Sequence, residues 1–337
     1  MDSSTSEILN HTLDSFSSTV PIVKKSKLNT SGASNVARPF LKWAGGKKQL
    51  LGEFDKRFPN DLFNGQINKY VEPFVGGGAV LFHALQEFEF DECHIYDANE
   101  ELILVYSVVK NDVDILIEKL RLLQSSYLVL DEEGRKEFFY DIRIKFNENK
   151  SEIDFNTYGL DWVERASELI FLNRTCFNGL FRVNSKGEFN VPVGRYKNPK
   201  IVDENNLQNA SMVLKNVEIH HGDFEDCESV VDERTFVYFD PPYRPISKTS
   251  SFNSYSKDLF DDESQKRLAR FYKKLHLKGA RLMLSNSDPK NENPDDHFFE
   301  DIYTEFNIER VPAKRMINAK GSGRGSIKEL IITNYSE

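Results

Sequence analysis

The sequence predicts an α/β protein with a doubly wound sheet and a second domain inserted into it. Short apolar runs alternate with helical patterns, as they do when a mostly parallel sheet is covered on both faces. This alternation stops between about Asn111 and Lys215 and then resumes. The chain has 337 residues, a length that suits about two domains.

Apolar runs that lack polar residues almost entirely are typical of strands buried on both faces. The predicted strands are Tyr70–Phe74, His94–Tyr96, Val217–His220, Phe236–Phe239, Arg281–Leu284, Ile308–Val311 and Leu330–Thr333. The predicted helices of the sheet domain are Gly46–Arg57, Ala79–Glu87, Asn99–Lys110 and Glu263–His276. Their order implies right-handed crossovers between parallel strands.

Residues 39–110 and 215–337 are predicted to form the sheet domain, and residues 111–214 the insert. The insert begins with helical patterns at Val113–Leu123, Glu133–Asn147 and Trp162–Asn173. It continues with Phe177–Tyr196, where Asn, Gly and alternating Phe and Val predict a β-hairpin. Residues 1–38 are rich in Ser and Thr, so we expect a disordered tail.

Composition limits the classes of function. Apolar residues make up 39% of the chain and aromatic residues 12%, enough for a sizeable core. The net charge of −9 means that nucleic-acid binding would need a local basic patch. No apolar run approaches a membrane span or a secretory signal, so we expect a cytoplasmic protein. The three scattered cysteines contain no CxxC pair, which argues against a disulfide scaffold or a zinc site.

Two features suggest a ligand that contains a nucleoside. The run Val71–Gly78 joins a strand to a helix through three consecutive glycines, which let the backbone approach a ligand closely. Asp97 ends the next strand, at the place where ribose hydroxyls are bound in sheets of this kind. Either feature alone has an ordinary interpretation, as a tight turn or as a helix N-cap.

Asp240-Pro241-Pro242-Tyr243 follows an apolar strand. Two consecutive prolines forbid a helix and fix a stiff, extended turn at the end of the strand. The acidic and aromatic side chains are therefore held in a set geometry. The tetrapeptide is a signature of methyltransferases that act on exocyclic amino groups of bases.

From Phe40 to Tyr335 the chain resembles the Dam family of DNA adenine-N6 methyltransferases, in the motif order of its alpha group. Several motifs carry this resemblance: Phe40–Lys47, Glu72–Gly78, Asp97, Cys176–Asn184, Gly187–Pro192, Gly194–Tyr196, Asp240–Tyr243 and Leu284–Asn286. The resemblance implies a Rossmann-like, seven-stranded S-adenosylmethionine-dependent methyltransferase sheet in which the insert recognises the target.

The resemblance also implies S-adenosylmethionine as the methyl donor. The implied donor-binding residues are Trp43, Lys47, Glu72, Gly76, Gly78, Asp97, Asp223, Phe224 and Asp240. Trp43 would offer a ring face to the sulfonium, and Lys47 a cation to the methionine carboxylate. Asp97 would accept hydrogen bonds from the ribose, and Asp223 with Phe224 would bind the adenine. Without the resemblance, Trp43 and Lys47 would be read as an ordinary core residue and a surface charge.

The expected catalytic residues are Asp240, Pro241 and Tyr243. An aromatic amine is a poor nucleophile because its lone pair is delocalised into the ring. If Asp240 and the Pro241 carbonyl accept its two hydrogens, the lone pair can point at the methyl group. Tyr243 can stack on a base rotated out of the duplex. Methylation at cytosine C5 would require a nucleophilic cysteine, usually after proline, and no Pro-Cys pair occurs.

The insert is expected to read double-stranded DNA. Basic side chains outnumber acidic ones six to one over residues 173–200, which provides a local patch for phosphates. The candidate DNA-binding residues are Lys42, Phe177, Asn178, Leu180, Arg182 and Arg195. Relatives with this hairpin commonly methylate the adenine of GATC, although Val193 stands where an aromatic residue is common among them. A solvated basic hairpin is the ordinary alternative.

Other functions remain open at this stage. An NAD-dependent dehydrogenase is disfavoured because GxGxxG is missing, and a catalytically silent DNA-binding relative because Asp240–Tyr243 is intact. An amino-methyltransferase acting on cytosine N4, RNA or protein is a closer rival, since related tetrapeptides serve those substrates. A restriction endonuclease that recognises the same site is a conceivable partner.

Overall fold

The structure, a computed structural model, describes residues 36–244, 260–314 and 326–336. The predicted tail lies outside these ranges except at its end, where the boundary needs correction. Ala37 is buried, and its backbone N–H and C=O bond the Gln86 side chain at 2.8 and 3.1 Å. The backbone N–H of Arg38 donates to Asn206 Oδ1, and Asn206 Nδ2 donates to the Arg38 carbonyl, each at 3.0 Å. The packed chain therefore begins before Pro39.

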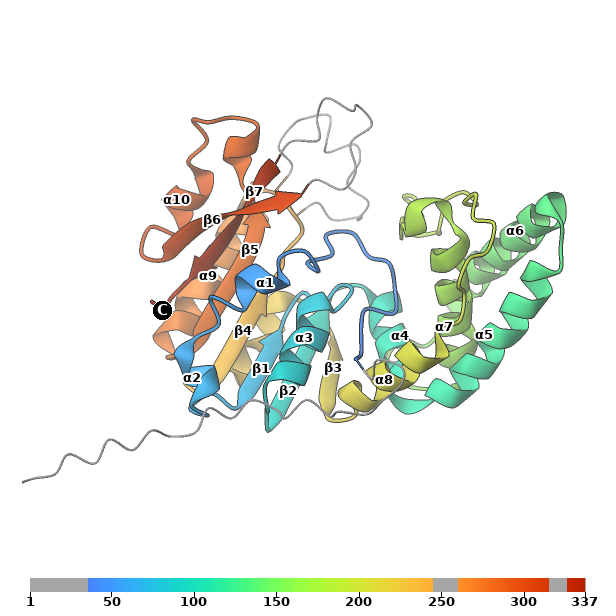
Figure 1. The fold of residues 1–337 in the computed structure, drawn as a ribbon, viewed down its shortest axis with the longest axis horizontal. Helices are drawn as coiled ribbons and strands as arrows, with labels where there is room; N and C mark the ends of the chain where they lie inside the picture. The colour runs from blue at the N-terminus through green and yellow to red at the C-terminus, as the bar shows by residue number, and fades with distance from the viewer. Residues whose placement is uncertain (1–35, 245–259, 315–325, 337) are drawn as a thin grey trace, which may run out of the picture.

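Seven strands of the described chain form one sheet in the order β3-β2-β1-β4-β5-β7-β6 (Figure 1). They are β1 Lys69–Glu72, β2 Glu92–Asp97, β3 Val217–His221, β4 Thr235–Phe239, β5 Arg281–Ser287, β6 Asn307–Lys314 and β7 Ser326–Thr333. This confirms all seven predicted strands. The pairs among β1 to β5 are parallel, whereas β7 lies antiparallel between β5 and β6.

The order reverses at the pair β1 and β4, and such a switch point is where open α/β sheets bind ligands. The strands β1 and β4 are short, and most of their residues are buried. Burial on both faces explains why β4 is a nearly continuous apolar run. The residues that follow the carboxyl ends of these strands are thus brought together.

Helices cover both faces of the sheet (Figure 1). α3 (Ala79–Glu87), α4 (Glu100–Asn111) and α8 (Glu204–Leu214) share a hydrophobic core with one face. α9 (Asp262–Leu277) and α10 (Phe298–Ile302) share a second core with the other. The helix α4 begins where Asn99 accepts hydrogen bonds from the backbone N–H groups of Glu101 and Leu102, a typical N-cap.

Two helix predictions need correction. The pattern Gly46–Arg57 forms a helix only at α1, Leu51–Phe54, because Gly45 is left-handed (φ 78°) and turns occupy the residues up to Leu50. The short helix α2, Asn60–Phe63, follows it. The helix α8 was not predicted: buried Asn206 and Asn209 interrupt its apolar face and mask the period.

The insert is helical, as predicted. It contains α5 (Val113–Leu128), α6 (Glu132–Glu148) and α7 (Leu160–Thr175), with short 3-10 turns at Asn149–Glu152 and Phe177–Gly179. α7 packs against α4, so the insert and the sheet domain share one hydrophobic core. A buried ion pair joins the two helices: Arg165 Nε donates to Glu101 Oε2 at 2.7 Å, and Arg165 is 1% exposed.

The predicted hairpin is present in an irregular form. The chain turns back at Asn184–Glu188 and makes isolated antiparallel bridges between Val183 and Phe189 and between Cys176 and Val193. Regular strands do not form because a 3-10 turn interrupts the first arm at Phe177–Gly179.

Candidate active site

The glycine turn after β1 is held in a conformation that favours glycine. Gly76 and Gly78 have φ of 46° and 71°, in the left-handed region. A Cβ on Gly76 would lie 3.2 Å from Trp43 Cδ1, and one on Gly78 would clash with the Tyr106 hydroxyl. That hydroxyl donates to Gly76 O at 3.1 Å. The turn therefore has no room for larger side chains, and Trp43 packs directly against it.

Two acidic side chains flank this turn. Asp97, half-buried at the end of β2, accepts hydrogen bonds from Gly76 N at 3.0 Å and Asn99 N at 2.9 Å. Burial raises its pKa, and these two bonds oppose the rise. Glu72 is 2% exposed and accepts from the Tyr70 hydroxyl at 2.7 Å. Burial raises the pKa of Glu72 well above its ordinary value.

Trp43 lies between the two domains. Its ring stacks on Phe181 of the insert, with centroids 5.3 Å apart and an interplanar angle of 20°. The ring is half-buried. Trp43 thus connects the glycine turn to the hairpin.

The predicted adenine-binding pair, Asp223 and Phe224, is engaged within the protein. Arg267 of α9 forms an ion pair with Asp223, and its guanidinium carbon lies 4.2 Å from the centroid of the Phe224 ring. Phe74 stacks on Phe224 at 5.3 Å, and Phe224 is 3% exposed. Binding of an adenine by this pair would require Arg267 to move or to share Asp223. Sequence reasoning missed Arg267, which no local motif marks.

The turn after β4 brings Lys47 and Asp240 together. Lys47 is 4% exposed, and its Nζ lies 2.6 Å from Asp240 Oδ1 and 3.0 Å from Gly45 O. Ser285 of β5 also donates to Asp240 Oδ1, at 3.3 Å. Among the described residues, Asp240 Oδ2 has no hydrogen-bond partner, so this oxygen can accept a hydrogen bond. Burial raises the pKa of Asp240, and the Lys47 ammonium lowers it in part.

Tyr243 completes this cluster. Its ring lies under the Lys47 ammonium, 4.6 Å from Nζ to the centroid, and its hydroxyl donates to Glu329 Oε2 at 2.5 Å. Glu329 belongs to β7 and is 9% exposed. Burial raises the pKa values of both Tyr243 and Glu329. Sequence reasoning missed Glu329, although an acid beside the apolar run Leu330–Ile332 is a detectable signal.

The hairpin is fixed to the loop that carries Lys42. The Asn173 amide, buried on α7, accepts from Lys42 N at 2.8 Å and donates to the carbonyls of Lys42 and Gly179, each at 2.9 Å. The stem of Lys42 also packs against Gly179. Its Nζ lies 4.5 Å from the centroid of the Tyr196 ring. Lys42 is thereby held beside the hairpin.

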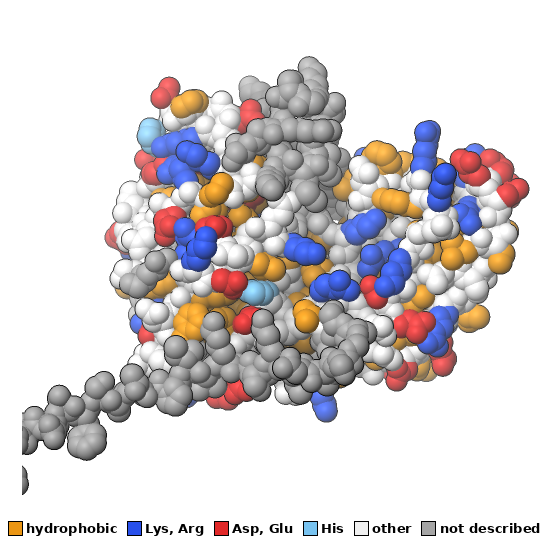
Figure 2. All heavy atoms as spheres, in the orientation of Figure 1, with side chains coloured by type: hydrophobic (Ala, Val, Ile, Leu, Met, Phe, Trp, Pro, Cys, Tyr) orange, Lys and Arg blue, Asp and Glu red, His pale blue; other side chains and the backbone are white. Residues whose placement is uncertain are grey.

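The other predicted DNA-binding residues lie along the hairpin. Phe177 is 52% exposed, and Asn178 beside it is left-handed at φ 57°, a conformation that Asn tolerates. Leu180 is half-buried against the core, and Arg195 is exposed. Arg182 is held within the hairpin, where its Nε donates to Asn190 Oδ1 at 2.5 Å. Figure 2 shows Lys and Arg side chains gathered on the face between the sheet and the helices of the insert.

The described residues contain no group of three or more His, Cys, Asp or Glu side chains that could hold a metal ion. None of the described helices combines the length and the apolar character that crossing a membrane requires. The three cysteines are buried and unpaired.

The chain is similar to known DNA methyltransferases. The profile of the D12 class N6 adenine-specific DNA methyltransferases matches residues 43–317. The type II methyltransferase M.MjaIII of Methanocaldococcus jannaschii is 58% identical over 299 residues, which are 88% of this chain and 99% of that protein. The type II methyltransferase M1.LlaDCHI of Lactococcus lactis subsp. cremoris is 40% identical, over 93% of this chain and 99% of that protein.

A third relative, the DNA adenine methylase of Escherichia coli K12, is 32% identical over 87% of this chain and 94% of its own length. The residues that match the family profile, 43–317, contain the glycine turn, the hairpin and the Asp240–Tyr243 turn. The chain therefore belongs to the D12 class of N6 adenine-specific DNA methyltransferases.

Proposed function

We propose that this protein methylates N6 of adenine within GATC in duplex DNA, by direct attack of the flipped-out adenine amine. Family membership supports adenine as the target base. The observation that carries the mechanism is the cluster of Asp240, Lys47 and Tyr243 at the switch point of the sheet. The hairpin motifs of the Dam family support GATC as the site.

S-adenosylmethionine is the methyl donor that a methyltransferase of this family implies, and it supplies an electrophilic methyl group when bound. The turn at Gly76–Gly78 is the proposed contact for this ligand, because it follows the carboxyl end of β1 at the switch point of the sheet and lies beside the Trp43 ring. Each Asp97 oxygen already accepts one backbone hydrogen bond and retains a lone pair for a ribose hydroxyl. Trp43 offers an aromatic face to the sulfonium.

Asp240 orients the target amine. Its Oδ1 is engaged by Lys47 and Ser285, which leaves Oδ2 to accept one amine hydrogen while the Pro241 carbonyl accepts the other. This geometry frees the nitrogen lone pair from the ring and directs it at the methyl group. The carboxylate also stabilises the positive charge that develops on the nitrogen, and it accepts the proton that leaves. No covalent intermediate is required.

Tyr243 provides the stacking face for the extruded adenine, with its hydroxyl fixed by Glu329. For the base to reach that face, the Lys47 ammonium must move aside while it keeps its contact with Asp240. Lys42, Arg182 and Arg195 contribute the positive charge that binds DNA, and Phe177, Asn178 and Leu180 the contacts that open or read the site.

Two relatives are named type II methyltransferases. We propose on that basis that the enzyme acts in the cytoplasm as the protective partner of a restriction endonuclease.

Single-molecule sequencing of DNA from cells that express the wild type or Asp240→Ala tests the proposal. We expect N6-methyladenine at GATC in the wild type and an unmodified genome in the variant. Methylation at another adenine site would overturn the GATC assignment. Methylated cytosine N4, or modified RNA with unmodified DNA, would favour the rival amino-methyltransferase.

A further inference from the structure

The catalytic turn, Asp240–Tyr243, has few backbone N–H groups that could stabilise its conformation. Pro241 and Pro242 have no backbone N–H, so this turn cannot be stabilised by internal hydrogen bonds from those positions. It depends instead on side chains from other elements. One of them is Gln265 of α9, which is fully buried and donates from Nε2 to Pro242 O at 3.1 Å.

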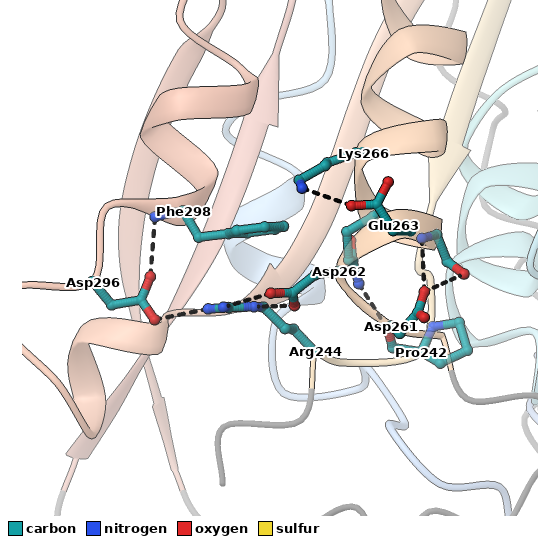
Figure 3. A network of polar contacts seen from close by, with 10 residues as sticks. Pro242, Arg244, Asp261, Asp262, Glu263, Lys266, Asp296 and Phe298 are labelled. Atoms are coloured by element: carbon teal, nitrogen blue, oxygen red, sulfur yellow. Dashed lines mark hydrogen bonds and ion pairs between the residues drawn. The ribbon is translucent and has the colours of Figure 1, made fainter. Parts of the chain in front are cut away.

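Arg244, the residue after Tyr243, makes a more extensive attachment (Figure 3). Its Nε and Nη2 donate to the two oxygens of Asp262 at 2.6 and 3.0 Å, in a planar fork. Its Nη1 donates to Asp296 Oδ2 at 2.7 Å. Its guanidinium carbon lies 4.1 Å from the centroid of the Phe298 ring. One side chain thus joins the end of the catalytic turn to α9 and to the start of α10.

This attachment is geometrically restrictive. Asp262 is the first residue of α9, and Asp296 is itself held by the backbone N–H of Phe298 at 3.0 Å. Arg244 and Asp296 are 19% and 21% exposed, so solvent screens their ion pair only in part. The hydrogen bond from Arg244 lowers the pKa of Asp262, which keeps the fork charged at neutral pH.

Tyr243 is therefore fixed at both ends. Its hydroxyl is held by Glu329 on β7, and its backbone continues directly into Arg244. We infer that Arg244 is a positioning residue for methyl transfer: by clamping the turn to Asp262 and Asp296, it sets where the Tyr243 ring presents the target base. This inference rests on the proposed roles of Asp240 and Tyr243.

A loosened turn is expected to reduce turnover and leave the donor site intact. Misplacement of reacting groups by about 1 Å can cost on the order of 100-fold in rate, so we expect Arg244→Ala to lower kcat by about 10- to 100-fold. The donor Kd should change by less than about twofold, because Asp97 and the glycine turn belong to other strands. Arg244→Lys should recover only part of the rate, since an ammonium cannot reproduce a planar fork.

The experiment measures kcat, donor Kd and melting temperature on the full chain, with 2-aminopurine fluorescence at the target position as a direct report of base placement. Asp262→Asn removes the negative charge of the fork and one of its two acceptor oxygens. Combined with Arg244→Ala, it should add little to the loss, as expected of partners in one interaction. Arg121→Ala is the matched control: Arg121 forms the same fork with Glu204, at 2.6 Å for both bonds, between α5 and α8.

The inference is supported if Arg244→Ala and Asp262→Asn lower kcat and alter the 2-aminopurine signal while Arg121→Ala does neither. It is overturned if Arg244→Ala leaves kcat unchanged, or if donor affinity falls as much as kcat does. It is also overturned if kcat is no higher in Arg244→Lys than in Arg244→Ala, or if Arg121→Ala lowers kcat as much as Arg244→Ala does. Should Arg244→Ala fail to fold, Asp262→Asn and Asp296→Asn carry the same test. Full activity of Asp240→Ala would instead overturn the proposed function, whatever Arg244 does.

Discussion

Replacement of Lys47 by methionine tests the electrostatics of the site. The Lys47 ammonium lies 2.6 Å from Asp240 Oδ1, and its side chain is 4% exposed, so little water screens the pair. Methionine has a similar length but no charge. Two roles for Lys47 give different results: a partner that keeps Asp240 ionised, or a cation that binds the methionine carboxylate of the donor.

The short contact between Lys47 Nζ and Asp240 Oδ1 favours the first role. An opposite charge at short range lowers the pKa of a carboxyl group by about 1–3 units, which equals roughly 1.4–4 kcal/mol. Burial already raises the pKa of Asp240, and Lys47 opposes that rise. Without Lys47, this pKa goes up. In the proposed mechanism the ionised carboxylate is the active form, so activity is lost as the pH falls through that pKa. The acid limb of kcat should therefore shift to higher pH by about 1–3 units.

The assay follows kcat against pH at saturating donor and DNA, with donor Kd measured separately by titration calorimetry. Lys48→Met is the matched control, since Lys48 is adjacent and exposed. If the acid limb of kcat does not shift and the donor Kd is weakened tenfold or more, Lys47 does not act by keeping Asp240 ionised. That result would assign Lys47 to the donor carboxylate, as the family resemblance implies.

Three further predictions concern other parts of the molecule. Arg165→Met should lower the free energy of unfolding, measured by urea denaturation, by about 3–5 kcal/mol, because it leaves the buried Glu101 without its ion-pair partner. Replacement of both Arg165 and Glu101 by methionine should recover part of this loss. Arg182→Ala should reduce discrimination between correct and altered flanking bases by about 5- to 150-fold in kcat/KM, whereas a uniform loss across sites would make Arg182 a phosphate contact. Glu329→Ala should lower kcat by about tenfold or more in single-turnover assays and Glu329→Gln by less, because glutamine still accepts from the Tyr243 hydroxyl; equal losses would contradict this.

The sheet could be predicted because strands that are buried on both faces have nearly continuous apolar sequences. In β4, for example, Phe236–Phe239 is an unbroken apolar run, and the polar residues Thr235 and Asp240 flank it. The helix predicted at Gly46–Arg57 was wrong in its first half. The spacing of apolar residues does not reveal that Gly45 adopts a left-handed conformation or that the Lys47 side chain pairs with Asp240.

The site was predictable only where a motif marks it. Asp97, Gly76 and Asp240 lie at strand ends, and their positions follow from the topology. The pairing of Lys47 with Asp240 joins residues far apart in the chain, and so does that of Tyr243 with Glu329. Such contacts depend on the packing of whole elements, which periodicity and spacing do not encode.

The identity of the methylated atom, measured with and without the Asp240 carboxylate, shows whether the enzyme methylates adenine N6 through Asp240. Purified wild type and Asp240→Asn are each incubated with S-adenosylmethionine and a duplex with one GATC site, and the nucleosides are analysed by mass spectrometry. We expect N6-methyl-2′-deoxyadenosine as the product. The variant should keep its melting temperature but react at least about tenfold more slowly, which corresponds to a barrier higher by ~1.4 kcal/mol or more. Another methylated nucleoside, or a variant that keeps more than about a tenth of the wild-type rate, would contradict this expectation.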